Sequence, residues 1–268
     1  MLASKTRYFR IGALALAISG TIAATPALAD GELSASAAVS NMYLWRGLDL
    51  GDGSAAVSGD LTYSLGGAYG GVWISSGDST LGSEYDLYFG YGAEMGDFSF
   101  DISLWNYNYS DGSPNVTGSE ENAIAALNLL QQIPVFPAAL AGVTTTADVT
   151  DDTTGELSEI ITTVAYKGIS LSYYDNIAGA TGYEYWTLSG GYEKFSATLG
   201  FHDFDLPSAS IGNENMTHLN LNYAFNDNLT FTVSKIIDQD CDNGDTNCVG
   251  AFDEDVNVAL SYALPIDV

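Results

Sequence analysis

The sequence predicts an all-β protein, a transmembrane antiparallel up-and-down β-barrel of about 12 strands. Three observations support this prediction. Apolar and polar residues alternate with a period of two in segment after segment. The 268-residue chain is rich in strand and turn residues, with 17 Tyr, 11 Phe and 29 Gly against only 6 Pro. Short turns and longer connections also alternate along the chain, which is typical of barrels in the outer membrane.

An export segment precedes the predicted barrel. Residues 1–29 begin with three positive side chains, continue with the apolar run IGALALAISGTIAA, and end on the small-x-small motif ALA. This pattern is typical of a secretory signal peptide, which is removed from the mature protein. An uncleaved anchor helix is the alternative, and the ALA motif favours cleavage. We therefore expect residues 30–268 to form the mature barrel.

The charge of the chain limits its partners. Cleavage removes three of the seven Lys and Arg residues and none of the 34 Asp and Glu residues. The mature chain keeps Arg46, Lys167, Lys194 and Lys235, and its formal charge is −30. So few positive charges cannot neutralise phosphates, which excludes nucleic acid and disfavours a peripheral protein on anionic lipid. We expect no cofactor.

Twelve segments have the alternation of strands. In SGDLTYSL, Asp60 and Thr62 share one face while Leu61 and Tyr63 share the other. Every backbone polar group in lipid must be paired within the protein, so the sheet must close and turn its apolar face outward. A soluble β-sandwich or barrel would bury that face instead, but aromatic residues near the strand ends favour a lipid-facing surface. The strands are predicted to begin near Glu32, Ala55, Ala68, Ser83, Phe98, Glu156, Ile169, Tyr183, Phe195, Thr217, Leu229 and Asp255.

The connections between these segments predict the two rims of the barrel. The short ones are turn motifs, namely LGG near Gly66, EMGD near Gly96, KG at 167–168, EK at 193–194 and NDN at 226–228. The long ones are GLDLGDGSA, SGDSTLG, residues 110–155, DNIAGATG, DFDLPSASIGNEN and DQDCDNGDTNCVGAFDE. We expect the short turns and both termini on the periplasmic side and the long loops outside. Near the C-terminus, Pro265 is expected to break the last strand.

The longest predicted loop, about residues 110–155, contains a candidate helix. In SEENAIAALNLLQQIP, Ser119 can cap the helix and Pro134 can end it. Ile124, Leu127 and Leu130 share one face. This apolar face has two readings that stay open: it packs on other loops, or it folds into the mouth of the barrel.

A second acidic loop, about residues 238–254, contains both cysteines. Export to an oxidising compartment makes a Cys241–Cys248 disulfide the default expectation. The closely spaced Asp238, Asp240, Asp242 and Asp245 also resemble a calcium-binding loop. However, the glycine of the segment does not fall at the sixth position of an EF-hand loop, so an acidic surface loop closed by the disulfide is favoured over calcium binding.

Charged residues on the inward face are the candidate site. We expect Arg46, Asp60, Glu84, Asp86 and Asp101 to line the pore. The first strand, continued to Arg46, places this arginine on the inward register and puts Tyr43 and Trp45 in the outer aromatic girdle. An arginine on the lipid face at mid-depth would cost about 2–4 kcal/mol, which also favours the lumen. There, Arg46 is expected to meet the four carboxylates.

The first hairpin is similar to a known family. SNMYLWRGLDL, followed by SGDLTYSLGGAYGGVWISS, resembles the opening of the TorF family of porin-like proteins, with its S-x-Y-h-h-R-G motif (h apolar) and a later G-h-W-h-S segment. Asn41 and Met42 stand where the motif has a single residue, which shifts the spacing by one. The resemblance covers residues 33–110 and implies an outer-membrane β-barrel with porin function in a Gram-negative bacterium. It implies no catalytic residues. The matching residues are Ser40, Tyr43, Arg46, Gly47, Gly71, Trp73 and Ser75.

The sequence therefore predicts transport by passive diffusion. A polar lumen would lower the cost of moving small hydrophilic solutes or ions across lipid, and the acidic excess predicts a preference for cations. The alternative is a closed barrel with a structural role or a loop that binds a metal ion or partner. We expect no enzyme, because HDFD at His202 to Asp205 is the only local catalytic candidate and fits a solvated strand end better.

Overall fold

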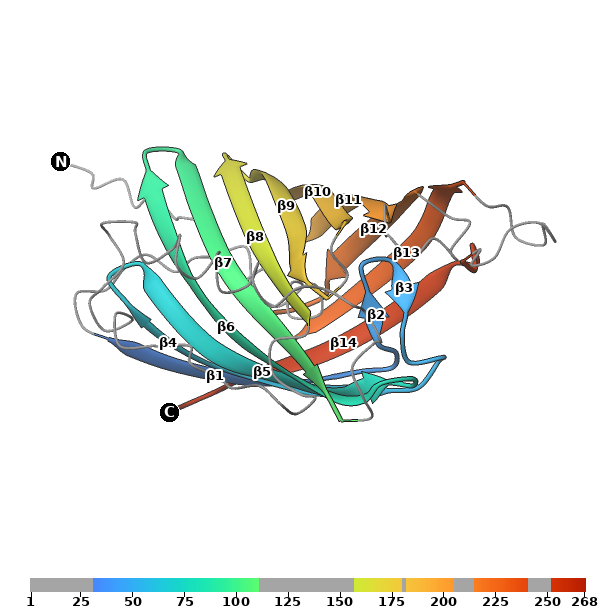
Figure 1. The fold of residues 1–268 in the computed structure, drawn as a ribbon, viewed down its shortest axis with the longest axis horizontal. Helices are drawn as coiled ribbons and strands as arrows, with labels where there is room; N and C mark the ends of the chain where they lie inside the picture. Colours follow the sequence, from blue (N-terminus) through green and yellow to red (C-terminus); the bar gives the residue numbers. More distant parts are fainter. Residues whose placement is uncertain (1–30, 111–156, 180–181, 205–214, 241–251) are drawn as a thin grey trace.

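A closed twelve-stranded antiparallel β-barrel forms the protein, and a separate two-stranded hairpin accompanies it (Figure 1). The computed structural model describes residues 31–110, 157–179, 182–204, 215–240 and 252–268. Within these ranges the predicted fold class is confirmed, because the described chain contains strands and no helix. The predicted helix in 110–155 and the Cys241–Cys248 disulfide lie outside the described residues.

Among the described residues, no helix is both long enough and apolar enough to cross a membrane.

The twelve wall strands follow one another around the barrel in chain order, and each begins within two residues of its predicted start. The barrel closes where β1 pairs with β14, from Ala35 opposite Ile266 to Ser40 opposite Ser261. The separate hairpin is formed by β2 (Leu44–Trp45) and β3 (Leu48–Asp49). The wall strands are β1 (Glu32–Ser40), β4 (Ala56–Leu65), β5 (Ala68–Asp78), β6 (Gly82–Met95), β7 (Phe98–Tyr109), β8 (Leu157–Tyr166), β9 (Ile169–Ala178), β10 (Tyr183–Tyr192), β11 (Phe195–Phe204), β12 (Asn215–Ala224), β13 (Leu229–Gln239) and β14 (Asn257–Ile266).

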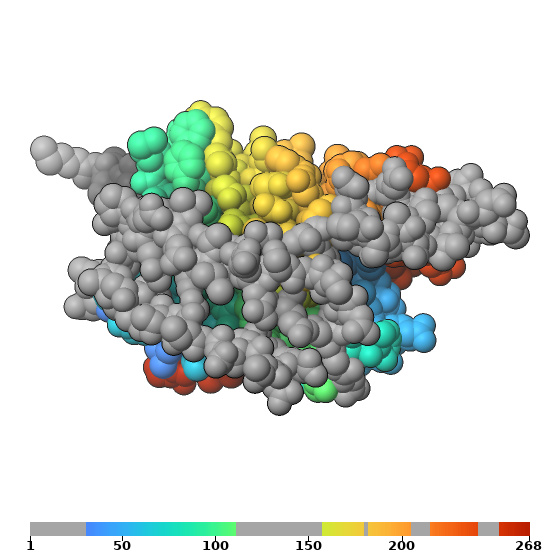
Figure 2. Space-filling model, in the orientation of Figure 1, coloured from blue at the N-terminus to red at the C-terminus, as the bar shows by residue number. Residues whose placement is uncertain are grey.

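The outer face of the wall is apolar. Each of the twelve wall strands carries at least one large hydrophobic side chain that is exposed, such as Leu61 on β4 and Leu188 on β10. The neighbouring Thr62 and Thr187 are buried on the opposite face. Figure 2 shows part of this outer face, with β6 and β7 in green followed by the yellow and orange strands along the upper flank. The apolar residues therefore face out, the inverse of a soluble barrel.

Short turns join the strands at one rim. Lys167 and Gly168 have φ values of 49° and 84°, as a two-residue type I′ turn between twisted strands requires. In the turn between β12 and β13, the Asn226 side chain accepts hydrogen bonds from the backbone N–H groups of Asn228 and Leu229, at 2.9 and 2.8 Å. These turn residues fix the register of their hairpins, as the sequence predicted.

Two connections at the other rim are shorter than expected. SGDSTLG was predicted as a long loop, but β5 continues to Asp78 and β6 already begins at Gly82. The Asp78 carboxylate accepts hydrogen bonds from the N–H groups of Thr80 and Leu81, which closes the turn tightly. In the same way, the first half of DNIAGATG belongs to β9, which ends at Ala178. The two rims differ less in loop length than the sequence suggested.

The last strand also differs from its prediction. β14 continues through Pro265, which lies opposite Ser36 of β1. Proline lacks one backbone donor, and at the second-last residue of a strand this removes at most one ladder hydrogen bond. The expected break at Pro265 was therefore wrong, and β14 pairs with β1 as far as Ile266, its last residue.

The chain leaves the wall after Ser40, and residues 42–50 fold inside the barrel, whereas residues 52–55 are exposed. The Asn41 side chain holds this departure point by accepting from the N–H of Leu260 (2.6 Å) and donating to the carbonyl of Val258 (3.1 Å), both on β14. Met42 and Leu44 pack with Ala259 of the same strand in a buried cluster. These contacts take the place of the strand-to-strand hydrogen bonds that the segment after Ser40 no longer makes with the wall.

The expected outer position of Tyr43 and Trp45 was therefore wrong. The first strand ends six residues before Arg46, so the alternation of β1 does not extend to it. Tyr43 is only 3% exposed, and its hydroxyl donates to the Glu84 carboxylate inside the barrel. A phenol with a buried acceptor is more stable there than on an apolar outer surface.

Closure of the barrel can be tested at the seam. In a Cys241→Ser/Cys248→Ser background, Ala38→Cys with Ala263→Cys should form an intramolecular disulfide on mild oxidation, because these residues are directly opposed. Opposed residues in antiparallel strands have Cα atoms about 4.5–5.5 Å apart, within the range that a disulfide bridges. Non-reducing electrophoresis measures it. Equal cross-linking of Ala38→Cys with Leu264→Cys, whose side chains point to opposite faces, would contradict this register.

Candidate functional site

Arg46 lies at the tip of the infolded hairpin. Trp45 pairs with Leu48, and the two residues between them have φ values of 47° and 88°, those of a type I′ turn. Gly47 is needed there for a second reason. A Cβ on Gly47 would lie 2.5 Å from Cγ of His218, so only glycine lets the tip approach β12 this closely.

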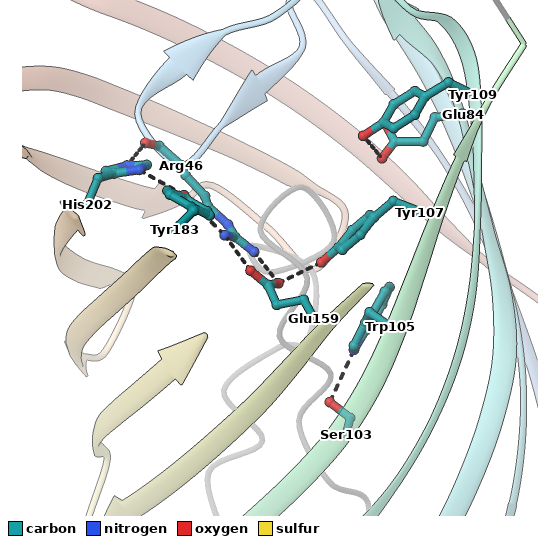
Figure 3. Close-up of polar contacts among 9 residues, drawn as sticks. All are labelled: Arg46, Glu84, Ser103, Trp105, Tyr107, Tyr109, Glu159, Tyr183 and His202. Carbon is teal, nitrogen blue, oxygen red and sulfur yellow. Dashed lines mark hydrogen bonds and ion pairs between the residues drawn. The ribbon is translucent and has the colours of Figure 1, made fainter. Parts of the chain in front are cut away.

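The guanidinium of Arg46 forms a bidentate ion pair with Glu159 of β8 (Figure 3). Its Nη1 donates to Oε1 at 2.8 Å and its Nη2 to Oε2 at 2.5 Å. Nη1 also donates to the hydroxyl of Tyr183 at 3.2 Å, and Tyr107 donates to Glu159 Oε2 at 2.8 Å. Arg46 and Glu159 are 5% and 1% exposed, so this ion pair is removed from water. Such a pair is stable only where further hydrogen bonds satisfy both groups.

Aromatic rings surround the same guanidinium. Its Cζ lies 4.5 Å from the ring centroids of Trp45 and Tyr174, 4.7 Å from that of Tyr185 and 5.7 Å from that of Tyr183. The faces of aromatic rings attract cations, and the attraction is stronger when the site is desolvated. The lumen therefore contains a cage for a guanidinium, built from one carboxylate and four rings on β2, β9 and β10.

Two buried histidines hold the tip from the other side. His202 Nε2 donates to the backbone carbonyl of Arg46 at 2.9 Å, and Nδ1 accepts from Tyr183 at 2.9 Å. His218 contacts the hydroxyl of Tyr185 at 2.8 Å through Nε2. His218 Nδ1 also donates to Asn220 Oδ1 at 3.1 Å, so the described polar contacts of the two rings reach the hairpin, its cage and this neighbouring amide. His202 of the HDFD segment is buried in the lumen rather than at a solvated strand end.

The predicted pore-lining carboxylates point inward but do not meet Arg46. Asp60 accepts from Thr62 and Tyr88, both at 2.7 Å. Asp101 accepts from the hydroxyl of Tyr69, which lies 2.9 and 3.0 Å from its two carboxylate oxygens.

The two carboxylates on β6 have different surroundings from each other. Glu84 accepts from Tyr43 and, at 3.0 Å, from Tyr109 (Figure 3). Asp86 is buried, and its Oδ1 has no hydrogen-bond partner among the described residues. The expectation that Arg46 pairs with these carboxylates was wrong, because the infolded hairpin carries it across the lumen to Glu159.

Glu159 and the tyrosines are the site residues that the sequence reasoning missed. The segment from Glu156 alternates poorly, with Ile160 and Ile161 adjacent and Thr162 and Thr163 adjacent, so its sequence assigns no face to Glu159. A signal was available: Tyr107 and Tyr109 share parity with Asp101 on β7, and tyrosines on a polar register indicate phenols that donate to carboxylates. The aromatic residues were instead interpreted as an outer girdle.

The lumen is narrower at the end that holds the hairpin. There Tyr174, His202, His218 and Glu159 are each at most 2% exposed. Toward the short turns, inward side chains such as Ser189, which hydrogen-bonds Thr198 at 2.9 Å, are only half-buried. The infolded segment therefore constricts the lumen near the rim where β7 ends and β8 begins.

Comparison with known proteins finds a family model over part of the chain. A model of a bacterial protein family of unknown function (Gcw_chp) matches residues 23–130, less than half of the chain. This range includes the infolded hairpin and β4 to β7. A search of curated protein sequences finds no match.

Two solved structures are distantly similar to this chain. The crystal structures of Pseudomonas aeruginosa OccK2 (OpdF), alone and in complex with glucuronate, share 12% and 10% sequence identity with this chain, with TM-scores of 0.35 and 0.34. In both, 79% of this chain is matched, and the match spans 58% of the other chain. A likeness this distant carries no argument about function.

The ion pair at the hairpin tip should be strongly coupled. Arg46→Ala or Glu159→Gln alone leaves a buried charge without its partner, which costs about 3–5 kcal/mol. Each single variant should lower the thermal stability of the folded barrel, and the double variant should be less destabilised than the sum of the two. Unfolding in detergent micelles measures this. Thr163→Ala, a lumen change away from the pair, is the control, and an unaffected Arg46→Ala variant would contradict the account.

Proposed function

We propose that this protein is an outer-membrane channel through which small hydrophilic solutes, cations in particular, diffuse passively. One observation carries the proposal: a closed barrel whose outer face is apolar on all twelve strands encloses a face lined by polar and acidic side chains. In such a closed sheet the backbone N–H and C=O groups of the strands are hydrogen-bonded to one another, so the barrel is stable in lipid. Its interior offers polar contacts to a solute.

The outer surface supports a membrane location. Aromatic pairs lie near the short turns, with Phe98 and Tyr166 at 4.6 Å and Phe195 and Tyr223 at 5.0 Å between ring centroids. Aromatic girdles at this level are typical of barrels at the membrane interface. Lys235 is a charged residue that is exposed on the outer face of β13. It lies four residues before the strand end at Gln239, so its long side chain can place the ammonium group at the membrane–water interface.

Charge supports the preference for cations. Asp60, Glu84, Asp86, Asp101 and Glu159 lie on the inward face together with the guanidinium of Arg46, which is already paired with Glu159. Four acidic side chains are then without a positive partner among the described residues, namely Asp60, Glu84, Asp86 and Asp101. Lumen charges of one sign raise the local concentration of the opposite ion.

A closed barrel with a structural or binding role is the second candidate. The specific observation in its favour is the infolded hairpin, which is held by hydrogen bonds to β8, β10 and β11 and fills the lumen near one rim. A lumen filled by side chains is common in small barrels, and twelve strands lie between those and the wide porins. Conductance separates the two candidates.

Three further parts of the proposal are predictions from the sequence alone. They are cleavage after Ala29, a periplasmic position of the short turns, and membership of the TorF family. The same holds for the disulfide and for calcium at the acidic loop, while an enzymatic role is not proposed. The partners expected are outer-membrane lipid and small solutes.

The channel is tested in planar bilayers. The purified protein should give stepwise currents, and the reversal potential in a KCl gradient should show that K⁺ permeates more readily than Cl⁻, because the lumen is acidic. Arg46→Ala should increase this preference. A protein that inserts but gives no current would favour the closed barrel, whereas clear anion selectivity would contradict the charge argument.

The lipid-facing surface is tested by one charge. Leu188 is the sixth of ten residues in β10 and is 52% exposed. Leu188→Arg should lower the stability of the barrel in vesicles by about 2–4 kcal/mol, because arginine would sit near the middle of the bilayer. Urea titration of folding measures it. Ser189→Arg, on the half-buried inward face, is the matched control, and an equal loss in both variants would argue against a lipid-facing Leu188.

A further inference from the structure

We propose that Glu84 and Asp86 of β6 form a binding site for a small organic cation, one that carries an ammonium or guanidinium group. The inference names the solute class of the proposed channel and rests on that function for its physiological meaning. Both side chains point into the lumen beside the infolded hairpin, and both are buried, at 4% and 3% exposure. Tyr43 joins the site to the hairpin through its hydrogen bond to Glu84.

Unsatisfied oxygens indicate that the site lacks a partner. Asp86 Oδ1 is buried and has no hydrogen-bond donor among the described residues. Ser75 lies directly opposite Glu84 on β5, is 5% exposed, and its Oγ is likewise unpartnered. Buried polar atoms are nearly always paired, so two orphaned oxygens around one carboxylate pair indicate a donor that the described residues do not supply.

The charge at this point is also uncompensated. The Asp86 carboxyl group is hydrogen-bonded to that of Glu84 and interacts electrostatically with that of Glu159. Arg46 balances Glu159, but among the described residues Lys167, Lys194 and Lys235 are all exposed outside the lumen. Buried carboxylates are stable as anions only when paired. A cation from solution would supply the missing charge and the missing donors together.

The surroundings favour an organic cation over a metal ion. The described residues contain no group of three or more His, Cys, Asp or Glu side chains arranged to hold a metal, and calcium needs six to eight oxygens. An ammonium or guanidinium is satisfied by a few acceptors and by aromatic faces. The lumen already shows this chemistry at Arg46, which one carboxylate and several rings hold. Next to Asp86, Tyr107 and Trp73 lie opposite on the two neighbouring strands.

Calorimetric titration of the micellar protein with L-arginine amide tests the site directly. Wild type should bind one equivalent, and Asp86→Asn should weaken binding at least tenfold, because it removes the charge but keeps the side-chain shape. Asp101→Asn is the matched control: it also removes one inward carboxylate, but one that Tyr69 already satisfies. The control should stay within threefold of wild type.

The outcomes separate the site from the channel. Asp86-dependent binding in micelles without current in bilayers would keep the site and reject channel function. Current without binding, or equal affinity in wild type and Asp86→Asn, would overturn the site and leave the channel proposal standing. Binding of Ca²⁺ but not of arginine amide would overturn the organic-cation assignment. In a conducting protein, arginine amide should block K⁺ current at least tenfold more weakly in Asp86→Asn than in Asp101→Asn.

Discussion

The buried ion pair between Arg46 and Glu159 determines how the interior of this barrel is filled. Removing two charges from water is favourable only when the remaining donors and acceptors are satisfied, and here Tyr107, Tyr183 and the surrounding rings do so. His202 fixes the backbone at the same point. Because the hairpin tip meets β8, β10, β11 and β12 at once, its position sets the width of the lumen at that end.

The filled interior and the apolar exterior follow from one constraint on the sheet. A closed sheet leaves no unpaired edge, so the wall needs no cover, and its outward side chains can be hydrophobic on every strand. The polar side chains must then satisfy one another inside. Tyrosine suits this task because its ring fills space while its hydroxyl donates to a carboxylate, as Tyr69 does to Asp101 and Tyr109 to Glu84.

The sequence was sufficient for the wall because strand alternation and turn chemistry are local signals. The turn at Lys167–Gly168 and the strand from Phe98 depend only on neighbouring residues. It was not sufficient for the site, because alternation does not show where a strand stops. WRG is compatible with a continuing strand, and only the contacts of Asn41 with β14 and of Gly47 with His218 reveal that the chain turns inward. The partner of Arg46 lies 113 residues away, a separation that no local pattern encodes.

The same contacts explain why a strongly acidic interior keeps a single arginine. If Arg46 were part of a wall strand, it would neutralise a carboxylate on a neighbouring strand, and no hairpin would fill the lumen. Carried to the centre on a hairpin, it instead neutralises Glu159 on the far side and leaves the carboxylates of β4, β6 and β7 with hydroxyl donors alone. Phenols stabilise carboxylates by hydrogen bonds but contribute no charge, so the field of these acids persists in the lumen. Among the described residues, the one cation on the inward face thus shapes the lumen while leaving its acidic character in place.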